Sequence, residues 1–274
     1  AGALRQADLG PDAPKKLPDL TGLHILVAED NLTNQLVVGQ MLEVMGAEFK
    51  LASDGVEALE MFEADNYDLV LLDIEMPRLT GLDVIRRIRA RTDSRQATSL
   101  LALTAYAMPD HIHKIVSLGA NGVIAKPLTS LAELGNAVLG QSTAKLVVEK
   151  PRQDPPQKGA LDAIDPKIYG ALTKAMGPEV MGELIEKIAS DLGEVHENLL
   201  KGLTQKDIGY LRSATHNLSS LAGTIGASNL QNYAQVLNAE VKSAPWIEVE
   251  PKIKVAVGAV ESVLTFVAKE IGNW

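Results

Sequence analysis

Five polar residues suited to phosphoryl chemistry stand directly after short apolar runs of the chain. They are Glu29, Asp30, Asp73, Thr104 and Lys126. Three carboxylates gathered in one crevice repel one another unless a divalent cation joins them, and hard oxygen ligands suit Mg²⁺. A lysine and a hydroxyl beside them would hold the oxygens of a phosphoryl group. Asp73 could then act as a carboxylate nucleophile that forms an acyl phosphate.

The elements that must position these residues are short apolar runs alternating with helical patterns. The runs predict five strands, at 24–28, 49–52, 68–72, 99–103 and 122–125, with helices at 33–45, 55–64, 81–90, 109–118 and 129–138. Such alternation predicts a doubly wound α/β fold with a five-stranded parallel sheet, whose functional crevice lies at the carboxyl ends of the strands. Any one polar residue there could simply be a solvated strand end. Five together favour a site.

A second candidate, His216, lies on a predicted helix over 205–225. The helix has one apolar stripe, formed by Ile208, Leu211, Leu218, Leu221, Ala222 and Ile225. At about 100° per residue, His216 falls roughly 130° from the stripe centre and should face solvent. On the same outward face of the helix, its neighbours at i+3, i+4 and i+7 are Ser219, Ser220 and Gly223. This strip of small residues would let another protein approach the imidazole closely. His24, His111, His113 and His196 lack such a surround and are interpreted as ordinary histidines.

Composition divides the chain into four parts. Residues 1–22 are predicted to be a linker, 23–140 the α/β domain, 141–161 a proline-rich spacer, and 162–274 an all-α antiparallel helical bundle. The net charge of −9 argues against nucleic acid as a direct partner. The chain has no cysteine and no apolar run long enough for a membrane segment, which is compatible with a cytoplasmic protein. Because Ala1 opens the sequence, we expect a fragment of a longer protein, whose parent could be membrane-attached.

Residues 23–139 resemble a response-regulator receiver domain. The resemblance is carried by Glu29-Asp30 after the first strand, by Asp73-Ile-Glu-Met-Pro-Arg-Leu-Thr-Gly81 after the third, by Thr104-Ala after the fourth and by Lys126-Pro127 after the fifth. It implies that Asp73 is the phosphoacceptor and that Thr104 and Lys126 bind the phosphoryl oxygens. It also implies a Mg²⁺ site formed by Glu29, Asp30, Asp73 and the Glu75 carbonyl, and a cis peptide before Pro127.

Three features qualify this resemblance. A phosphatase of the haloacid dehalogenase type also uses an aspartyl nucleophile, but it carries a second aspartate where this chain has Glu75, and no cap domain is inserted here. Receivers usually have Phe or Tyr at the position of Val123, so this chain lacks the aromatic residue that is usually coupled to the threonine. Tyr106 could shield the phosphoryl group instead. Alternatively, it could be a partly exposed aromatic residue at the start of a helix.

The stretch from His216 to Ala227 resembles the histidine phosphotransfer (Hpt) motif. His216, Leu218, Gly223 and Gly226 match the motif, whereas Ser219 and Ser220 replace its usual Lys-Gly pair. A receiver followed by an Hpt domain is typical of the C-terminal part of a hybrid sensor histidine kinase. The resemblance therefore implies a phosphorelay component.

The resulting hypothesis is that Asp73 accepts a phosphoryl group from the phosphohistidine of a kinase core, expected upstream in the same protein. His216 then takes the group and passes it to a downstream response-regulator receiver. No Gly-rich ATP site is found, so whether this stretch is itself an enzyme stays open and it is not expected to start the relay. The alternative is a non-catalytic docking module or phosphate sink with an impaired Hpt domain.

Overall fold

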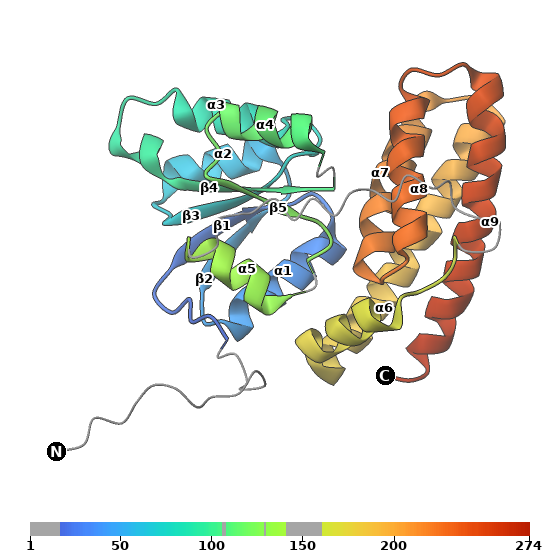
Figure 1. The fold of residues 1–274 in the computed structure, drawn as a ribbon, viewed down its shortest axis with the longest axis horizontal. Coiled ribbons are helices and arrows are strands. Elements are labelled where there is room, and N and C mark those ends of the chain that lie inside the picture. The colour runs from blue at the N-terminus through green and yellow to red at the C-terminus, as the bar shows by residue number, and fades with distance from the viewer. Residues whose placement is uncertain (1–16, 106–107, 129, 141–160) are drawn as a thin grey trace.

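The computed structural model describes residues 17–105, 108–128, 130–140 and 161–274. Tyr106, and the spacer between the two domains up to residue 160, lie outside the described residues. Figure 1 shows an α/β domain standing beside a bundle of long helices. No helix in the described ranges is both long and apolar enough to span a bilayer.

A five-stranded parallel sheet forms the centre of the first domain, with strand order β2-β1-β3-β4-β5. The strands are β1 (His24–Ala28), β2 (Glu48–Ala52), β3 (Leu69–Asp73), β4 (Ser99–Thr104) and β5 (Gly122–Ala125). The order reverses between β1 and β3, which places the topological switch point beside the carboxyl ends of these two strands. The predicted strands are confirmed to within one residue at each end.

Two helical layers cover the sheet because alternate strand residues point to opposite faces. On one face, Ile25 and Leu71 pack with α1 (Leu32–Val44) and α5 (Leu131–Val138). On the other, Leu26, Val70 and Leu72 pack with α2 (Gly55–Ala64), α3 (Gly81–Arg89) and α4 (Pro109–Ser117). All strand residues of β3 are buried, as expected for a central parallel strand.

The segment just before β1 belongs to this domain. Within the predicted linker 1–22, Leu20 is fully buried, and its N–H donates to the carbonyl of Met45. A Cβ on Gly135 would come within 2.5 Å of Pro18, so the segment also lies against α5. The packed part of the domain therefore begins before residue 23. Proline content alone could not show this, because the packing depends on tertiary contacts.

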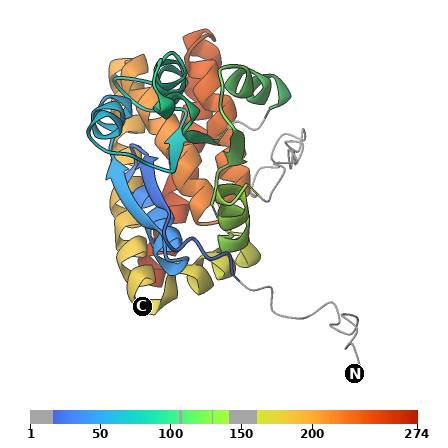
Figure 2. The same cartoon turned by 90° about the vertical axis from the view of Figure 1, so that its left-hand side faces the viewer.

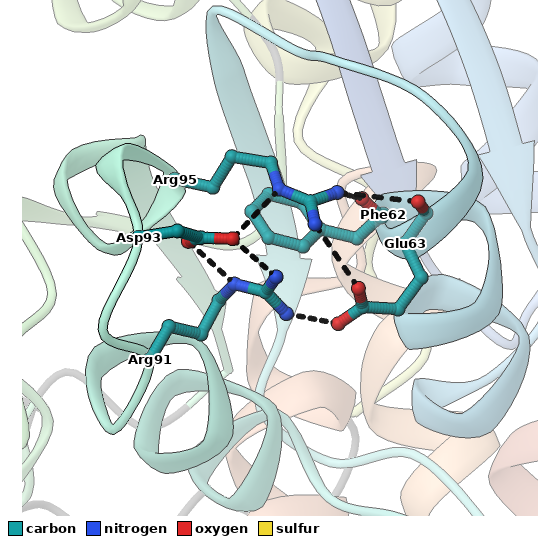
Figure 3. A network of polar contacts seen from close by, with 5 residues as sticks. All are labelled: Phe62, Glu63, Arg91, Asp93 and Arg95. Atoms are coloured by element: carbon teal, nitrogen blue, oxygen red, sulfur yellow. Dashed lines mark hydrogen bonds and ion pairs between the residues drawn. The ribbon is translucent and has the colours of Figure 1, made fainter.

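At the opposite end of the sheet from the carboxyl strand ends, a polar network holds the α3–β4 connection, with its short helix η1 (Ser94–Ala97), against α2 (Figure 3). Asp93 accepts from Arg91 at 2.6 Å and from Arg95 at 3.3 Å, and both arginines also pair with Glu63. The two guanidinium groups lie 5.9 Å from the centre of the Phe62 ring. Single ion pairs near the surface contribute little to the free energy of unfolding. We therefore interpret the network as holding the α3–β4 connection in position against α2.

The second domain consists of α6 (Pro166–Gln205), α7 (Ile208–Thr224), α8 (Ser228–Val241) and α9 (Trp246–Ile271). Short connections and adjacent packing in the order α6, α7, α8, α9 make it a bundle, as predicted. Gly177 has φ of 72° and interrupts α6 just before Pro178. Of the predicted α7 stripe, Leu211, Leu218 and the other three residues besides Ile208 are buried, whereas Ile208 is half-exposed.

The two domains pack against each other through α1. This helix contacts α6 and α7 as well as the sheet. Its buried residues accordingly lie on more than one face and include Thr33, Val37 and Val38. A helix that is apolar around most of its circumference is expected to be covered on both sides. The turned view in Figure 2 shows the helical bundle behind the sheet domain, in agreement with these contacts.

Candidate phosphoryl-transfer site

The acceptor candidate Asp73 is the last residue of β3 and is 2% exposed. Its Oδ1 accepts a hydrogen bond from the N–H of Glu75 at 3.2 Å, and its Oδ2 accepts one from Lys126 Nζ at 2.7 Å. The carboxylate is therefore held from both oxygens at the carboxyl edge of the sheet. This is the position at which the sequence predicted a nucleophile.

Gly81 closes the loop that follows Asp73. Its N–H donates to the carbonyl of Ile74 at 3.0 Å, and a Cβ at this position would lie 2.1 Å from the backbone oxygen of Asp73. No side chain can be accommodated there without moving backbone atoms. The glycine of the motif is thus explained by the close approach of two backbone segments.

Lys126 lies between two carboxylates. Its Nζ is 2.6 Å from Glu29 Oε2 and 2.7 Å from Asp73 Oδ2. Burial acts to lower the pKa of this lysine, but the charges of Asp73 and Glu29 outweigh it, and the pKa is raised above its ordinary value. The peptide bond between Lys126 and Pro127 is cis, as expected. Thr104, which ends β4, is 1% exposed, and its carbonyl accepts from the Lys126 N–H at 2.8 Å.

The first two acidic residues have different surroundings. Glu29 is buried and accepts from Lys126 and from Asn34 Nδ2 at 2.7 Å. Asp30 is partly exposed, yet its Oδ1 is buried without a hydrogen-bond partner among the described residues. Burial and the neighbouring charge of Asp73 raise the pKa of Asp30, and burial raises that of Glu29. An acidic oxygen such as Asp30 Oδ1, beside the carboxylate of Asp73, is what a divalent cation binds, so the residues present fit Mg²⁺.

His216 joins this acidic site from the other domain. One ring nitrogen of His216 and one oxygen each of Asp30 and Asp73 all lie within 4.8 Å of one another. His216 Nδ1 is also 2.8 Å from Glu75 Oε2. Burial acts to lower the pKa of His216, but the hydrogen bond to Glu75 and the nearby carboxylates raise it overall. The acceptor aspartate and the candidate relay histidine therefore lie in one site.

This arrangement corrects the expectation that His216 faces solvent. Its side chain is 22% exposed because the receiver edge covers it. Ser220 is 7% exposed and accepts a hydrogen bond from Asn34 at 2.7 Å. A helical wheel places residues relative to their own bundle only, and it cannot show that a second domain covers the outer face.

The small residues around His216 contact two different parts of the molecule, the other domain and the bundle itself. Ser220 meets the other domain, whereas a Cβ on Gly223 would lie 2.5 Å from Gln231 Nε2 of α8, within the bundle. Ser219, where the Hpt motif has lysine, is 3% exposed, and its Oγ has no hydrogen-bond partner in the part of the chain described. Gly226, just after the C-terminus of α7, has φ of 85°, a conformation that favours glycine.

Several contact residues were missed by sequence reasoning. Thr33 Oγ1 donates to Asp191 Oδ2 at 2.6 Å, and Asn34 bridges Glu29 and Ser220. Gln231 and Gln235 of α8 donate to the backbone carbonyls of Lys126 and Ala105 at 3.4 and 2.8 Å. The polar first turn of α1, directly after the acidic pair, was the available signal for Thr33 and Asn34. No pattern in the sequence marked the two glutamines.

Known proteins resemble this chain in its first domain, and some relatives match most of its length. Residues 25–139 match the response regulator receiver domain family. Aerobic respiration control sensor protein ArcB of Escherichia coli K12 is 29% identical over 243 residues, covering 84% of this chain and 30% of ArcB. Sensor histidine kinase AruS of Pseudomonas aeruginosa is 28% identical over 210 residues, covering 76% of this chain and 20% of AruS. The chain thus spans less than a third of the length of these relatives.

Among solved structures, the receiver domain of another Pseudomonas aeruginosa sensor histidine kinase is 34% identical. The match covers 44% of this chain and 97% of that one, with a TM-score of 0.41. That domain was solved with a magnesium ion coordinated in its active site cleft. The sheet order, the acidic edge and the family match agree, and residues 25–139 of this chain form a response regulator receiver domain.

Proposed function

We propose that the chain is a two-step phosphorelay unit, in which Asp73 accepts a phosphoryl group and transfers it to His216 of an Hpt domain formed by 162–274. The observation that carries this proposal is the approach of a His216 ring nitrogen to the Asp73 and Asp30 carboxylates, all within 4.8 Å. Transfer requires a donor and an acceptor held at close range, and two docked domains meet that need without a diffusional encounter.

In the first step, a carboxylate oxygen of Asp73 attacks the phosphorus of a phosphohistidine on a kinase core. The P–O bond forms as the N–P bond breaks, and the electron pair of that bond returns to the kinase imidazole. Lys126, whose Nζ is 2.7 Å from Asp73 Oδ2, and Thr104, which ends β4, would bind the phosphoryl oxygens. Mg²⁺, held by Asp30, Asp73 and the Glu75 carbonyl with Glu29 nearby, would supply charge that offsets the negative charge of the transferring group.

In the second step, the lone pair of a His216 ring nitrogen attacks the phosphorus of phospho-Asp73. The N–P bond forms, the P–O bond breaks, and its electron pair returns to the Asp73 carboxylate. Lys126, already 2.7 Å from Asp73 Oδ2, compensates the charge on the leaving carboxylate. The receiver thus brings the cation that Ser219 does not supply. A downstream receiver would then take the group from His216 after the two domains separate.

The test is to label the whole chain with a radioactive phosphodonor and to separate phosphoaspartate from phosphohistidine by their stability in base and acid. We expect label first on Asp73 and then on His216. His216→Gln should hold its label on Asp73, and Asp73→Asn should carry none on either residue. Label that stays on Asp73 in the wild-type chain, with His216 never modified, would reject the relay and favour the docking module or phosphate sink.

A further inference from the structure

The side chain of Glu75 reaches across the domain interface to the candidate relay histidine. Its Oε2 lies 2.8 Å from His216 Nδ1, and the two side chains are only 29% and 22% exposed. We propose that Glu75 is a positioning residue for the second transfer, which fixes the tautomer and orientation of His216. This inference rests on the proposed relay, and it gives Glu75 a side-chain role beyond the backbone carbonyl expected from the resemblance.

The chemical argument begins with the tautomers of a neutral imidazole. One ring nitrogen carries a proton and the other a lone pair, and the hydrogen bond made by one of them decides which is which. An ionised carboxylate can only accept, so Glu75 selects the form with the proton on Nδ1. A glutamate carboxyl group is ordinarily ionised at neutral pH. Nε2 is then the nitrogen left with the lone pair.

The same contact opposes the charge that develops during transfer. As Nε2 forms its bond to phosphorus, the ring becomes positively charged while its proton remains on Nδ1. A carboxylate at hydrogen-bond distance stabilises that charge without itself being protonated. The P–O bond of phospho-Asp73 breaks in the same step and returns its electrons to Asp73, so no other reactant is needed.

Glu75 also connects the two reacting groups. Its N–H donates to Asp73 Oδ1 at 3.2 Å while its carboxylate accepts from His216. The α7 neighbours of His216 at i+3, i+4 and i+7 are Ser219, Ser220 and Gly223, and those at i−4 and i−3 are Arg212 and Ser213. None of them is a carboxylate. The bundle therefore presents the histidine, and the receiver supplies the group that orients it.

Two variants of the whole chain separate this role from a merely structural one. Glu75→Met keeps a side chain of similar length but removes the acceptor, whereas Glu75→Gln keeps an acceptor oxygen without the charge. Each chain is loaded with acetyl phosphate and Mg²⁺, and the rate is measured as the fraction of Asp73-bound phosphate that moves to His216 with time. Expressing the rate this way removes differences in loading. Losing a hydrogen bond to a charged group should slow Glu75→Met about 10- to 100-fold, and Glu75→Gln, which restores the acceptor oxygen but not the charge, should recover part of the rate.

A spectroscopic readout tests the contact itself. Nitrogen NMR of histidine-labelled chain, at a pH where the ring is neutral, should show His216 with its proton on Nδ1, the signal being assigned by its loss in His216→Gln. Glu75→Met should show a mixture of tautomers. If the wild-type chain transfers phosphate and Glu75→Met transfers it at the same rate with an unchanged tautomer, the role of Glu75 is overturned. The relay itself would not be affected by that result. A wild-type chain that never modifies His216 would overturn the relay as well.

Discussion

The surroundings of Asp73 and those of His216 are built in different ways. Asp73 lies at the edge of one sheet, and its partners Glu75 and Lys126 come from the same domain and are fixed by strand register and a close backbone turn. His216 stands on the outer face of a helix, and the groups that meet it, Glu75 and Asp30, belong to the other domain. Under the proposed relay, His216 must serve more than one partner and so cannot be enclosed by its own domain. Asp73, as the proposed acceptor, would bind a metal and a phosphoryl group, which needs a prebuilt pocket.

The largest expected effect comes from removing the acceptor. Asp73→Asn has nearly the same shape but cannot form an acyl phosphate, so labelling by a kinase phosphohistidine or by acetyl phosphate should fall to background. Asp110→Asn, an exposed aspartate in the same domain, is the matched control and should label like the wild type. Undiminished labelling of the Asp73 variant would show that the enclosed pocket is not the acceptor site.

Removing Mg²⁺ should come next. Asp30 and Asp73 are close together, and Asp30 Oδ1 has no hydrogen-bond partner among the residues that the structure describes. Phosphorylation by acetyl phosphate should therefore be lost in excess chelator and return when Mg²⁺ is restored. Asp30→Asn should raise the Mg²⁺ concentration needed for half-maximal labelling. His216→Gln should leave that concentration unchanged if His216 is not a metal ligand. Equal labelling with and without chelator would contradict the metal site.

The two glycines at these sites should differ in what they tolerate. In Gly81→Ala the new Cβ meets the backbone oxygen of Asp73 at 2.1 Å, and we expect a loss of about 1–3 kcal/mol in the free energy of unfolding. In Gly223→Ala the Cβ meets the end of the flexible Gln231 side chain, and helix propensity favours alanine, so the change should stay within about 1 kcal/mol. Denaturant unfolding of both variants measures the difference. Equal losses would mean that the histidine face is as rigidly enclosed as the aspartate pocket.

The smallest effect concerns one contact between the domains. Asn34 donates to Ser220 across the interface at 2.7 Å. A double-mutant cycle with Asn34→Ala and Ser220→Ala should give a coupling energy of about 0.5–1.5 kcal/mol in the free energy of unfolding. A cycle pairing Asn34→Ala with the distant, exposed Ser262→Ala should give none. Zero coupling in the first cycle would indicate that the docked arrangement is not maintained in solution.

The sequence by itself determined the receiver architecture and its acidic edge. Strands of the receiver are short apolar runs, and parallel strands place their carboxyl ends at one edge, so Glu29, Asp30, Asp73, Thr104 and Lys126 could be brought together from order alone. Each polar residue directly follows or ends its own strand, and the parallel sheet brings these strand ends together. The bundle followed from helical periodicity in the same way.

Only the tertiary structure decided what covers His216. Which outer face of α7 is buried depends on the docking of a second domain, and no periodicity within the helix records it. The links from Glu75 to His216, from Asn34 to Ser220 and from Gln235 to the Ala105 carbonyl join residues more than 100 positions apart. Such pairs leave no local signal, because each residue is an ordinary polar side chain until the two domains meet.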